Sequence, residues 1–270
     1  MKKKKINLKN MNTPTENVIV FIVFFIIVVL IIYIIYKLRN TIRNRFKSMN
    51  LEFLTNKKIP KKIYMCYKNI IDLEKYSKKW KELNPEYEIE LYDDERCKDF
   101  LLKEYSQLHV DIFDHIKDGP IKSDFWRVCI INKYGGLYVD ADINPLVPLN
   151  EYIDDDDDFV TCISTAFKPN KKKWQLNPHF ILSHPNNKIL QNCIDEYVRM
   201  YKNNVKYSYW GWSVCQIIYI DKLKLKKSQV LYDNNTKYKF ILELNPNDCE
   251  YNGKLVLHNR YDNYKNHSFV

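Results

Sequence analysis

The chain has 270 residues, of which 46% are hydrophobic and 28% charged, a composition typical of a globular protein. Its net charge of +10 would indicate a nucleic-acid-binding protein only if the globular part carried the excess. Residues 1–62 hold 14 lysines and arginines against two acidic residues, so residues 63–270 have a net charge of −2. We therefore expect the basic arm to meet a membrane surface, and no nucleic acid as a partner.

Within this arm, residues 18–36 form an apolar run without a charge, glycine or proline. As a helix the run would span about 28 Å, close to the hydrocarbon thickness of a bilayer. It is longer than the apolar core of a cleaved signal peptide and lacks a small-residue cleavage site. We predict a basic tail over residues 1–17, a transmembrane helix over 18–36 that contacts the lipid bilayer, and a basic stem over 37–58.

The orientation of this anchor is not fixed by charge, because basic residues flank both of its ends. A single N-terminal anchor followed by a large domain is typical of a single-pass protein whose domain is lumenal or extracytoplasmic, and we expect that arrangement. Two glycosylation sequons, at residues 234–236 and 266–268, would be usable there, but such triplets are frequent by chance in an Asn-rich chain. The seven cysteines show no CxxC pair and no zinc-type spacing, so we interpret them as buried structural thiols, with a disulfide left open for an oxidising lumen.

From residue 59 onward the chain alternates between strand-like and helix-like segments, which predicts an α/β domain over 59–270 with a mixed, partly parallel sheet. We expect strands at residues 63–67, 87–92 and 137–140, and helices at 72–83, 94–105 and 121–133. Asp93 is placed to cap the second of these helices, and Gly135-Gly136 to end the third. Ligands of such sheets bind outside the carboxyl ends of strands, so residues that end strands are the candidates for a site.

Residues 119–149 contain the side chains best suited to chemistry. Asp124 and Arg127 lie three positions apart on a predicted helix, so both project from one face. Asp140 and Asp142 follow a predicted strand and, in an extended chain, would also share a face. Mg²⁺ and Mn²⁺ prefer oxygen ligands and are commonly shared between carboxylates and substrate phosphates. The segment therefore predicts a site for a divalent cation and a phosphate-bearing ligand.

The sequences SDFWR and YGGLYVDAD in this segment resemble the DXD-containing glycosyltransferases of family 32. That family includes the yeast-type initiating α-1,6-mannosyltransferases and, more distantly, the glucosylating clostridial toxins. Residues 59–63, Trp80 and residues 84–94 resemble other parts of the family, so the resemblance covers about residues 59–150. It implies a GT-A-like fold and a metal-dependent, retaining enzyme. Such an enzyme moves a sugar from a nucleotide-sugar donor (UDP- or GDP-sugar) to a glycan, glycoprotein or lipid acceptor.

The resemblance also implies a role for each residue of the segment. Asp124 and Arg127 are expected to contact the sugar and diphosphate of the donor, and Tyr138 to line the same pocket. Asp142 is expected to bind Mn²⁺ or Mg²⁺ directly, and Asp140 to contact the ribose or the metal with its water shell. The chain departs from the family at residues 209–213, where a Thr-Gly-Pro turn is usual.

Other polar patterns have less specific interpretations. We interpret the run Asp154–Asp158 as a solvated loop, and the lysine runs at 171–173 and 222–227 as solvent-facing. His258 is either a core histidine or a contact to metal or phosphate, while His179 and His184 are expected to be structural or surface residues. Trp210 and Trp212 are either core residues or platforms for a sugar or base.

Two other functions stay open. A phosphotransferase or phosphatase could use paired aspartates, but the residues after Asp142, Ile143-Asn144, do not supply the Thr-type loop that those enzymes need. A membrane-tethered module that binds a carbohydrate or nucleotide sugar without catalysis is the non-enzymatic alternative, and the altered turn at 209–213 motivates it.

Overall fold

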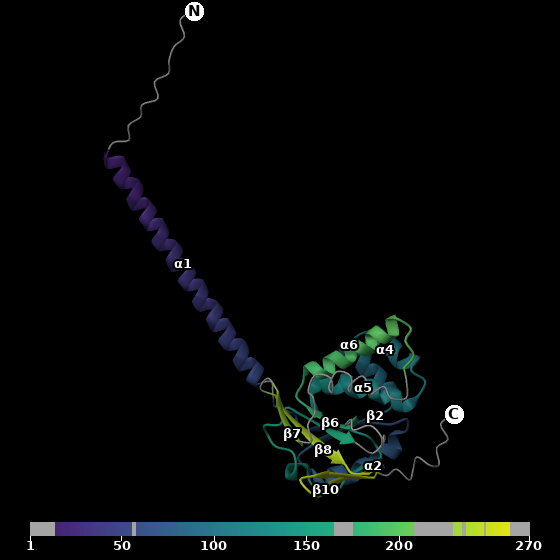
Figure 1. Cartoon of the computed structure of the whole chain (residues 1–270). Helices are drawn as coiled ribbons and strands as arrows, with labels where there is room; N and C mark the ends of the chain where they lie inside the picture. The colour runs from purple at the N-terminus through teal and green to yellow at the C-terminus, as the bar shows by residue number, and fades with distance from the viewer. Residues whose placement is uncertain are drawn as a thin grey trace, which may run out of the picture. The chain divides into compact units, whose positions relative to one another are not determined.

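The computed structural model describes residues 14–55, 58–164, 175–207, 229–233, 236–245 and 247–259. The chain divides into two compact units after Thr55. The described part of the first unit is one long helix, α1 (Pro14–Thr55; Figure 1), which contains the predicted anchor and continues through most of the predicted stem. Within α1, Val23–Arg43 is long and apolar enough to cross a bilayer, and none of it is buried inside the protein. By length and composition, this span agrees with the predicted membrane helix.

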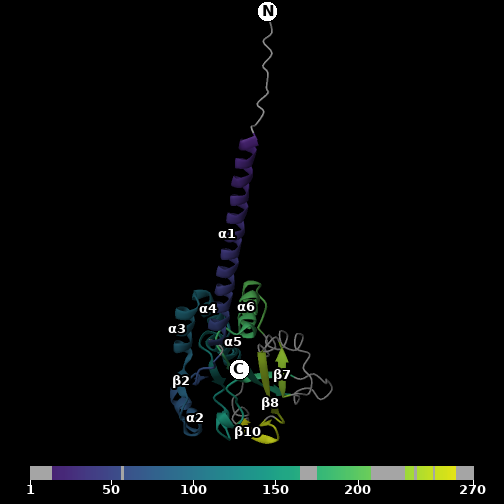
Figure 2. The same ribbon diagram turned by 90° about the vertical axis from the view of Figure 1, so that its left-hand side faces the viewer.

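The second unit is built on one sheet with ten strands in the described residues. The strands are β1 (Lys62–Cys66), β2 (Glu88–Tyr92), β3 (Gly136–Val139), β4 (Ile143–Pro145), β5 (Phe159–Ser164), β6 (Gln175–Ser183), β7 (Val230–Asp233), β8 (Thr236–Glu243), β9 (Asp248–Tyr251) and β10 (Lys254–Asn259). Their order is β2-β1-β3-β6-β5-β8-β9-β10-β4, and β7 pairs with β8 at one side (Figure 2). The pairs β1–β2, β1–β3 and β5–β8 are parallel, and the other pairs are antiparallel. The prediction of an α/β fold with a mixed, partly parallel sheet is confirmed.

Helices cover both faces of this sheet. The helices are α2 (Ile70–Leu83), α3 (Asp94–Glu104), α4 (Gln107–His115), α5 (Gly119–Tyr134) and α6 (Lys188–Lys202), and a single 3₁₀ turn, η1, spans Leu149–Glu151. Figure 1 shows α4, α5 and α6 gathered on one side of the strands and α2 on the other. One hydrophobic core lies between the helices α3, α4, α5 and α6 and one face of the sheet. A second core joins α2, η1, β4, β9 and β10 with the opposite face.

Strand β3 shows how the sequence assigns residues to these two cores. Leu137 and Val139 belong to the core under α2, whereas Tyr138 belongs to the core under α5. This follows from the alternation of side chains along a strand. Because α5 packs against this face, Tyr138 is brought next to Arg127 of that helix.

The glycine pair between α5 and β3 makes a tight junction. Gly135 and Gly136 have φ values of 68° and 97°, which side chains rarely adopt. A Cβ on Gly135 would lie 2.7 Å from Cδ of Pro185, and a Cβ on Gly136 would lie 2.8 Å from the carbonyl oxygen of Lys62. The predicted role of this pair as the end of the helix is confirmed. Its two glycines also let β3 start directly beside β1.

The predicted elements agree with the observed bounds to within two residues, and Asp93 caps α3 by accepting a hydrogen bond from the Arg96 backbone N–H. Helix α4 was not predicted. Helix α5 is buried on every side over residues 124–132. The reason is that α3, α4 and α6 pack around it while the sheet covers its remaining face.

Candidate functional site

The predicted site lies where three parallel strands end. Strands β2, β1 and β3 are neighbours and run in the same direction, so their carboxyl ends meet at one edge of the sheet. The residues that follow these ends are Asp93, Tyr67 and Asp140. In α/β proteins this edge is the usual place for a ligand. The structure therefore puts the segment that contains Asp140 and Asp142 at the predicted position.

Arg127 lies at the centre of the site as a buried cation. Its side chain is only 4% exposed and forms ion pairs with Asp124 and Asp140, each at 3.1 Å from Nη2. Nη1 donates a hydrogen bond to the carbonyl oxygen of Pro178 at 2.9 Å, and Nε donates to the carbonyl oxygen of Ser123 at 3.1 Å. Burial lowers the pKa of Arg127, but the charge of Asp140 together with Tyr138 and Asp124 raises it well above the ordinary value. The guanidinium therefore stays charged and fixes both carboxylates.

Tyr138 completes this group from the strand side. Its hydroxyl donates a hydrogen bond of 2.6 Å to Oδ1 of Asp140, the same oxygen that pairs with Arg127. The guanidinium carbon of Arg127 lies 4.6 Å from the centre of the Tyr138 ring. Burial is the main reason that the pKa of Tyr138 is raised. The hydroxyl therefore keeps its proton and donates a hydrogen bond to Asp140. Thus four of the five predicted site residues, all except Asp142, form one connected group.

The two aspartates do not lie in an extended chain, and that expectation is wrong. The backbone N–H of Ile143 donates to the carbonyl oxygen of Asp140 at 3.1 Å, which closes a turn over residues 140–143 before β4 begins. The carbonyl oxygen of Ile143 accepts a bond of 2.9 Å from Nε1 of Trp80, so α2 holds the far end of the turn. Burial is the first cause that raises the pKa of Tyr67, and the charge of Asp142 contributes, so Asp142 lies near the end of β1.

These carboxylates fit a hard divalent cation, because carboxylate oxygens are the ligands that Mg²⁺ and Mn²⁺ prefer. Their environments differ, however. Oδ1 of Asp140 already contacts a cation of the chain, Arg127, and the hydroxyl of Tyr138. Asp142 is half-buried in the turn that follows.

Strand β6 supports this group through its backbone. The carbonyl oxygen of Pro178 contacts Arg127, and that of His179 accepts a hydrogen bond of 2.9 Å from the backbone N–H of Asp140. The sequence did not predict this main-chain role of Pro178 and His179. No side-chain pattern could have indicated them, because they act through main-chain oxygens.

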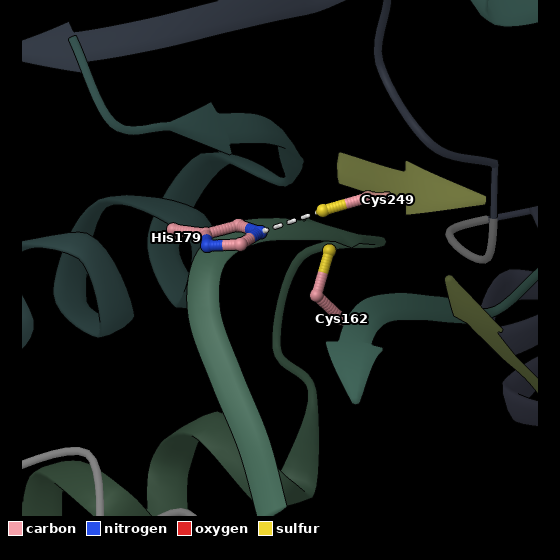
Figure 3. Close-up of side chains that lie close together, drawn as sticks. All are labelled: Cys162, His179 and Cys249. Carbon is pink, nitrogen blue, oxygen red and sulfur yellow. Dashed lines mark hydrogen bonds between the residues drawn. The ribbon is translucent and has the colours of Figure 1, made fainter. Parts of the chain in front are cut away.

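The imidazole of His179 points away from this group toward Cys162 and Cys249 (Figure 3). A hydrogen bond with Cys162 is the main cause that lowers the pKa of Cys249 to about 6, with help from His179 and against burial. Burial lowers the pKa of His179, but contact with Cys249 and the charges of Cys249 and Glu243 raise it to about 9. His179 is thus structural, as expected. The sequence has no zinc-type spacing and therefore did not indicate that the fold brings these three residues together.

The interpretation of Asp154–Asp158 as a solvated loop is wrong for two of its five residues. Asp157 and Asp158 are buried, whereas the other three are exposed. Nζ of the fully buried Lys239 lies 2.6 Å from Asp157 and 2.8 Å from Asp154. Lys237 pairs with Asp154, Asp156 and Asp157 at 2.6–3.1 Å. Two lysines of β8 thus neutralise these carboxylates, which speaks against a cation from solution there.

His258 and His184, the other two histidines named in the sequence analysis, differ in burial. His258 is half-exposed on β10, where it pairs with Asn144 of β4, and its Nδ1 lies 2.9 Å from a carboxylate oxygen of Asp248, so it is not a core residue. His184 is buried, with Nδ1 next to the carbonyl oxygen of Pro185. The predictions for Trp210, Trp212, both lysine runs, the second sequon and most of the first fall outside the described residues.

Residues 71–159 match the family model described as the glycosyltransferase sugar-binding region containing a DXD motif. That stretch includes Asp124, Arg127, Tyr138, Asp140 and Asp142. The predicted family resemblance is confirmed. An initiation-specific α-1,6-mannosyltransferase of Candida albicans is 32% identical over 108 residues, which cover 36% of this chain and 28% of that protein. The matches support the predicted enzyme class, a glycosyltransferase.

Another relative is a mannosyl phosphorylinositol ceramide synthase of Saccharomyces cerevisiae. It is 34% identical over 91 residues, which cover 31% of this chain and 22% of that protein. The chain thus spans about a quarter of the length of the curated relatives that it matches. Among solved structures, the PaToxG glycosyltransferase has a TM-score of 0.48 at 18% identity, covering 67% of this chain and 78% of that one.

Proposed function

We propose that this chain is a membrane-anchored, metal-dependent glycosyltransferase that moves a sugar from a UDP- or GDP-sugar to a glycan, glycoprotein or lipid acceptor with retention of configuration. The observation that supports this most directly is the connected group of Asp124, Arg127, Tyr138 and Asp140 at the strand ends. This group lies within the stretch that matches the sugar-binding region of the family. The apolar helix α1 supports the anchor by its length and composition.

The geometry suggests a division of work among the site residues. Arg127 is almost fully buried and directs its N–H groups to the protein, so we propose that it positions Asp140 and Asp124 for the donor. Asp142 would hold Mn²⁺ or Mg²⁺, which would stabilise the negative charge that develops on the departing nucleoside diphosphate. Asp140, fixed by Arg127 and Tyr138, would orient the ribose or the metal's water shell. Carboxylates held rigidly before the ligand arrives lower the cost of organising the site.

The relatives guide the choice of donor. Both are named for the transfer or attachment of a mannosyl group, one of them to a phosphorylinositol ceramide. A mannose-bearing nucleotide sugar is therefore the first donor to test, and a lipid acceptor is as reasonable as a glycan or glycoprotein.

The test uses the full chain, solubilised in detergent, with a panel of UDP- and GDP-sugars and Mn²⁺. We expect release of nucleoside diphosphate from at least one donor, loss of that release on chelation, and its loss in Asp142→Asn. The matched control is Asp155→Asn, an exposed aspartate of the Asp154–Asp158 loop, which should retain full activity. Full activity in Asp142→Asn would refute the assignment of the metal ligand.

The same panel separates the enzyme from the non-catalytic alternative. A chain that binds a nucleotide sugar with Mn²⁺ but releases no diphosphate from any donor or acceptor would favour a binding module. The anchor and its orientation need a separate measurement, protease protection of the domain in sealed membrane vesicles. We expect protection when the lumenal side faces inward.

A further inference from the structure

Three side chains from distant parts of the sequence meet in the core under α2. They are Cys162 of β5, His179 of β6 and Cys249 of β9, and all three are buried. Their ligand atoms, two Sγ and one imidazole nitrogen, lie within 4.8 Å of one another. Figure 3 shows the sulfur atom of Cys249 directed toward the ring of His179, and the sulfur atom of Cys162 directed toward that of Cys249. Nε2 of His179 lies 3.9 Å from Sγ of Cys249. Two sulfur atoms and one imidazole nitrogen are ligands typical of zinc.

A buried carboxylate on the strand next to Cys249 has one oxygen without a hydrogen-bond partner among the described residues. Glu243 of β8 is only 2% exposed, and its Oε2 has no hydrogen-bond partner among the described residues. Its other oxygen, Oε1, accepts a bond of 3.1 Å from Nδ2 of Asn177. A buried carboxylate oxygen without a partner is costly, because its negative charge has lost the solvation of water. A cation bound at this oxygen would offset that cost.

The strand register directs Glu243 to the same place as the cysteines. Glu243 is the direct partner of Cys249 in the β8–β9 pair, and residues paired in this way have Cβ atoms about 4.5–5.5 Å apart. In the parallel β5–β8 pair, Cys162 is the partner of Ile241, which lies two residues from Glu243 and therefore on the same face. The four residues come from the adjacent strands β6, β5, β8 and β9, one from each.

A disulfide between Cys162 and Cys249 does not explain this arrangement. Strand β8 lies between β5 and β9. Neighbouring strands are about 4.8 Å apart, so the backbones of β5 and β9 are about 9–10 Å apart, whereas a disulfide needs Cα atoms within about 7 Å. Two thiols that approach through their side chains across an intervening strand suit a bridging metal ion better than a covalent bond.

We propose that Cys162, His179, Glu243 and Cys249 bind one zinc ion that stabilises the fold. The two thiols and the imidazole already lie together, and the carboxylate of Glu243, whose other oxygen is held by Asn177, would move toward them as the fourth ligand of a tetrahedral structural site. Because all four ligands come from the protein and are buried, the site has no open position for a substrate. Soft thiolate ligands also disfavour Mg²⁺ and Mn²⁺, so this metal would be distinct from the one expected at Asp142.

The first experiment measures metal in the full chain, purified in detergent from zinc-containing medium without chelator. We expect about one zinc per chain by mass spectrometry of the elements, retained after dialysis against excess Mg²⁺. Replacement of zinc by Co²⁺ should give the visible absorption of a tetrahedral site and an ultraviolet band from thiolate-to-cobalt charge transfer. A wild-type chain that takes up neither zinc nor cobalt, or one whose peptide map shows a Cys162–Cys249 disulfide, overturns the proposal.

Variants then assign the ligands. Cys249→Ser and His179→Gln should each lower the bound zinc at least tenfold, and Glu243→Gln should weaken zinc binding in competition with a chelator. Cys193→Ser is the matched control, because it replaces an equally buried thiol in the other core, and its zinc should be unchanged. Equal zinc in Cys249→Ser, His179→Gln and the control would also overturn the proposal. None of these measurements depends on sugar transfer, so a failure of the proposed enzyme activity would leave the zinc site standing.

Discussion

Replacement of Asp140 by asparagine separates two roles that the aspartates of a DXD motif can have, as counter-ion of a buried arginine and as metal ligand. In this structure Asp140 is a counter-ion of the buried Arg127, which is 4% exposed, and is itself only 24% exposed. Asp140→Asn keeps an oxygen that can accept the hydrogen bond from Tyr138 but removes the negative charge. Asp142→Asn removes an equal charge two residues away while leaving both counter-ions of Arg127, Asp124 and Asp140, in place.

The magnitude follows from the loss of one of two charged partners. Deleting a partner of a buried ion pair costs about 3–5 kcal/mol, and a hydrogen bond to a charged group contributes about 1.5–3 kcal/mol. Because Asp124 remains and the asparagine oxygen still accepts a bond, we expect the free energy of unfolding to fall by about 1.5–3 kcal/mol in Asp140→Asn. For a domain of this size that is a decrease in melting temperature of about 3–12 °C. Asp142→Asn should shift it by about 2 °C or less.

The assay is thermal unfolding of the full chain in detergent, followed by tryptophan fluorescence without donor or added metal. Activity is measured in parallel as Mn²⁺-dependent release of nucleoside diphosphate. We expect both variants to lose activity but only Asp140→Asn to lose stability. If the two variants melted at the same temperature, Asp140 would not be the counter-ion that stabilises Arg127, and our assignment of separate roles to the two aspartates would fail.

Two further predictions concern the support of the site and the lysine–aspartate cluster. Gly136 has a φ of 97°, and a Cβ there would lie 2.8 Å from the carbonyl oxygen of Lys62. Gly136→Ala should therefore lower the free energy of unfolding by at least ~2 kcal/mol in denaturant titrations, whereas Gly119→Ala, at an uncrowded position, should change it by less than ~1 kcal/mol. Hydrogen bonds led by that from Lys239 hold the pKa of Asp154 below its usual 3.8, so this pairing stabilises the fold above pH 3.8 and is lost as pH falls through the lower, folded value. The melting temperature of Asp154→Asn should accordingly lie below that of wild type at pH 5 and converge with it once the pH falls below the lowered pKa of Asp154. A difference that stays constant with pH would contradict the pairing.

The sequence predicted the first half of the domain well because its signals are local. The helix ending at Gly135-Gly136 and the short strand that follows could be placed from composition and spacing alone. Asp124 and Arg127, three residues apart on one helix, form the ion pair that this spacing suggests. Parallel strands with their carboxyl ends at one edge then brought Asp140 to that helix.

The features that were missed depend on pairing between distant strands. Lys239 reaches Asp154 and Asp157 across 85 and 82 positions of sequence, so neither an acidic run nor a strand with alternating lysines indicates the partner. Cys162, His179 and Cys249 likewise follow no metal-binding spacing, because each comes from a different strand. The turn at Asp140–Ile143 was missed for a related reason. Nε1 of Trp80, far away on α2, holds it.

The bend in β6 connects the two parts of the domain that carry chemistry. Between Thr161 and Cys162 the pairing of β5 with β6 jumps from Ile181 to Asn177, so residues 178–180 have no partner in β5. This bend sends the imidazole of His179 toward the cysteines, while its backbone oxygens at Pro178 and His179 hold Arg127 and the N–H of Asp140. An irregular segment of this kind needs contacts on both sides to keep a single conformation. A metal ion on the imidazole side would supply that contact where the ladder does not. The stability of the group around Asp124 and Asp140 would then depend in part on Glu243 and Cys249, which lie more than a hundred residues after both aspartates in the sequence.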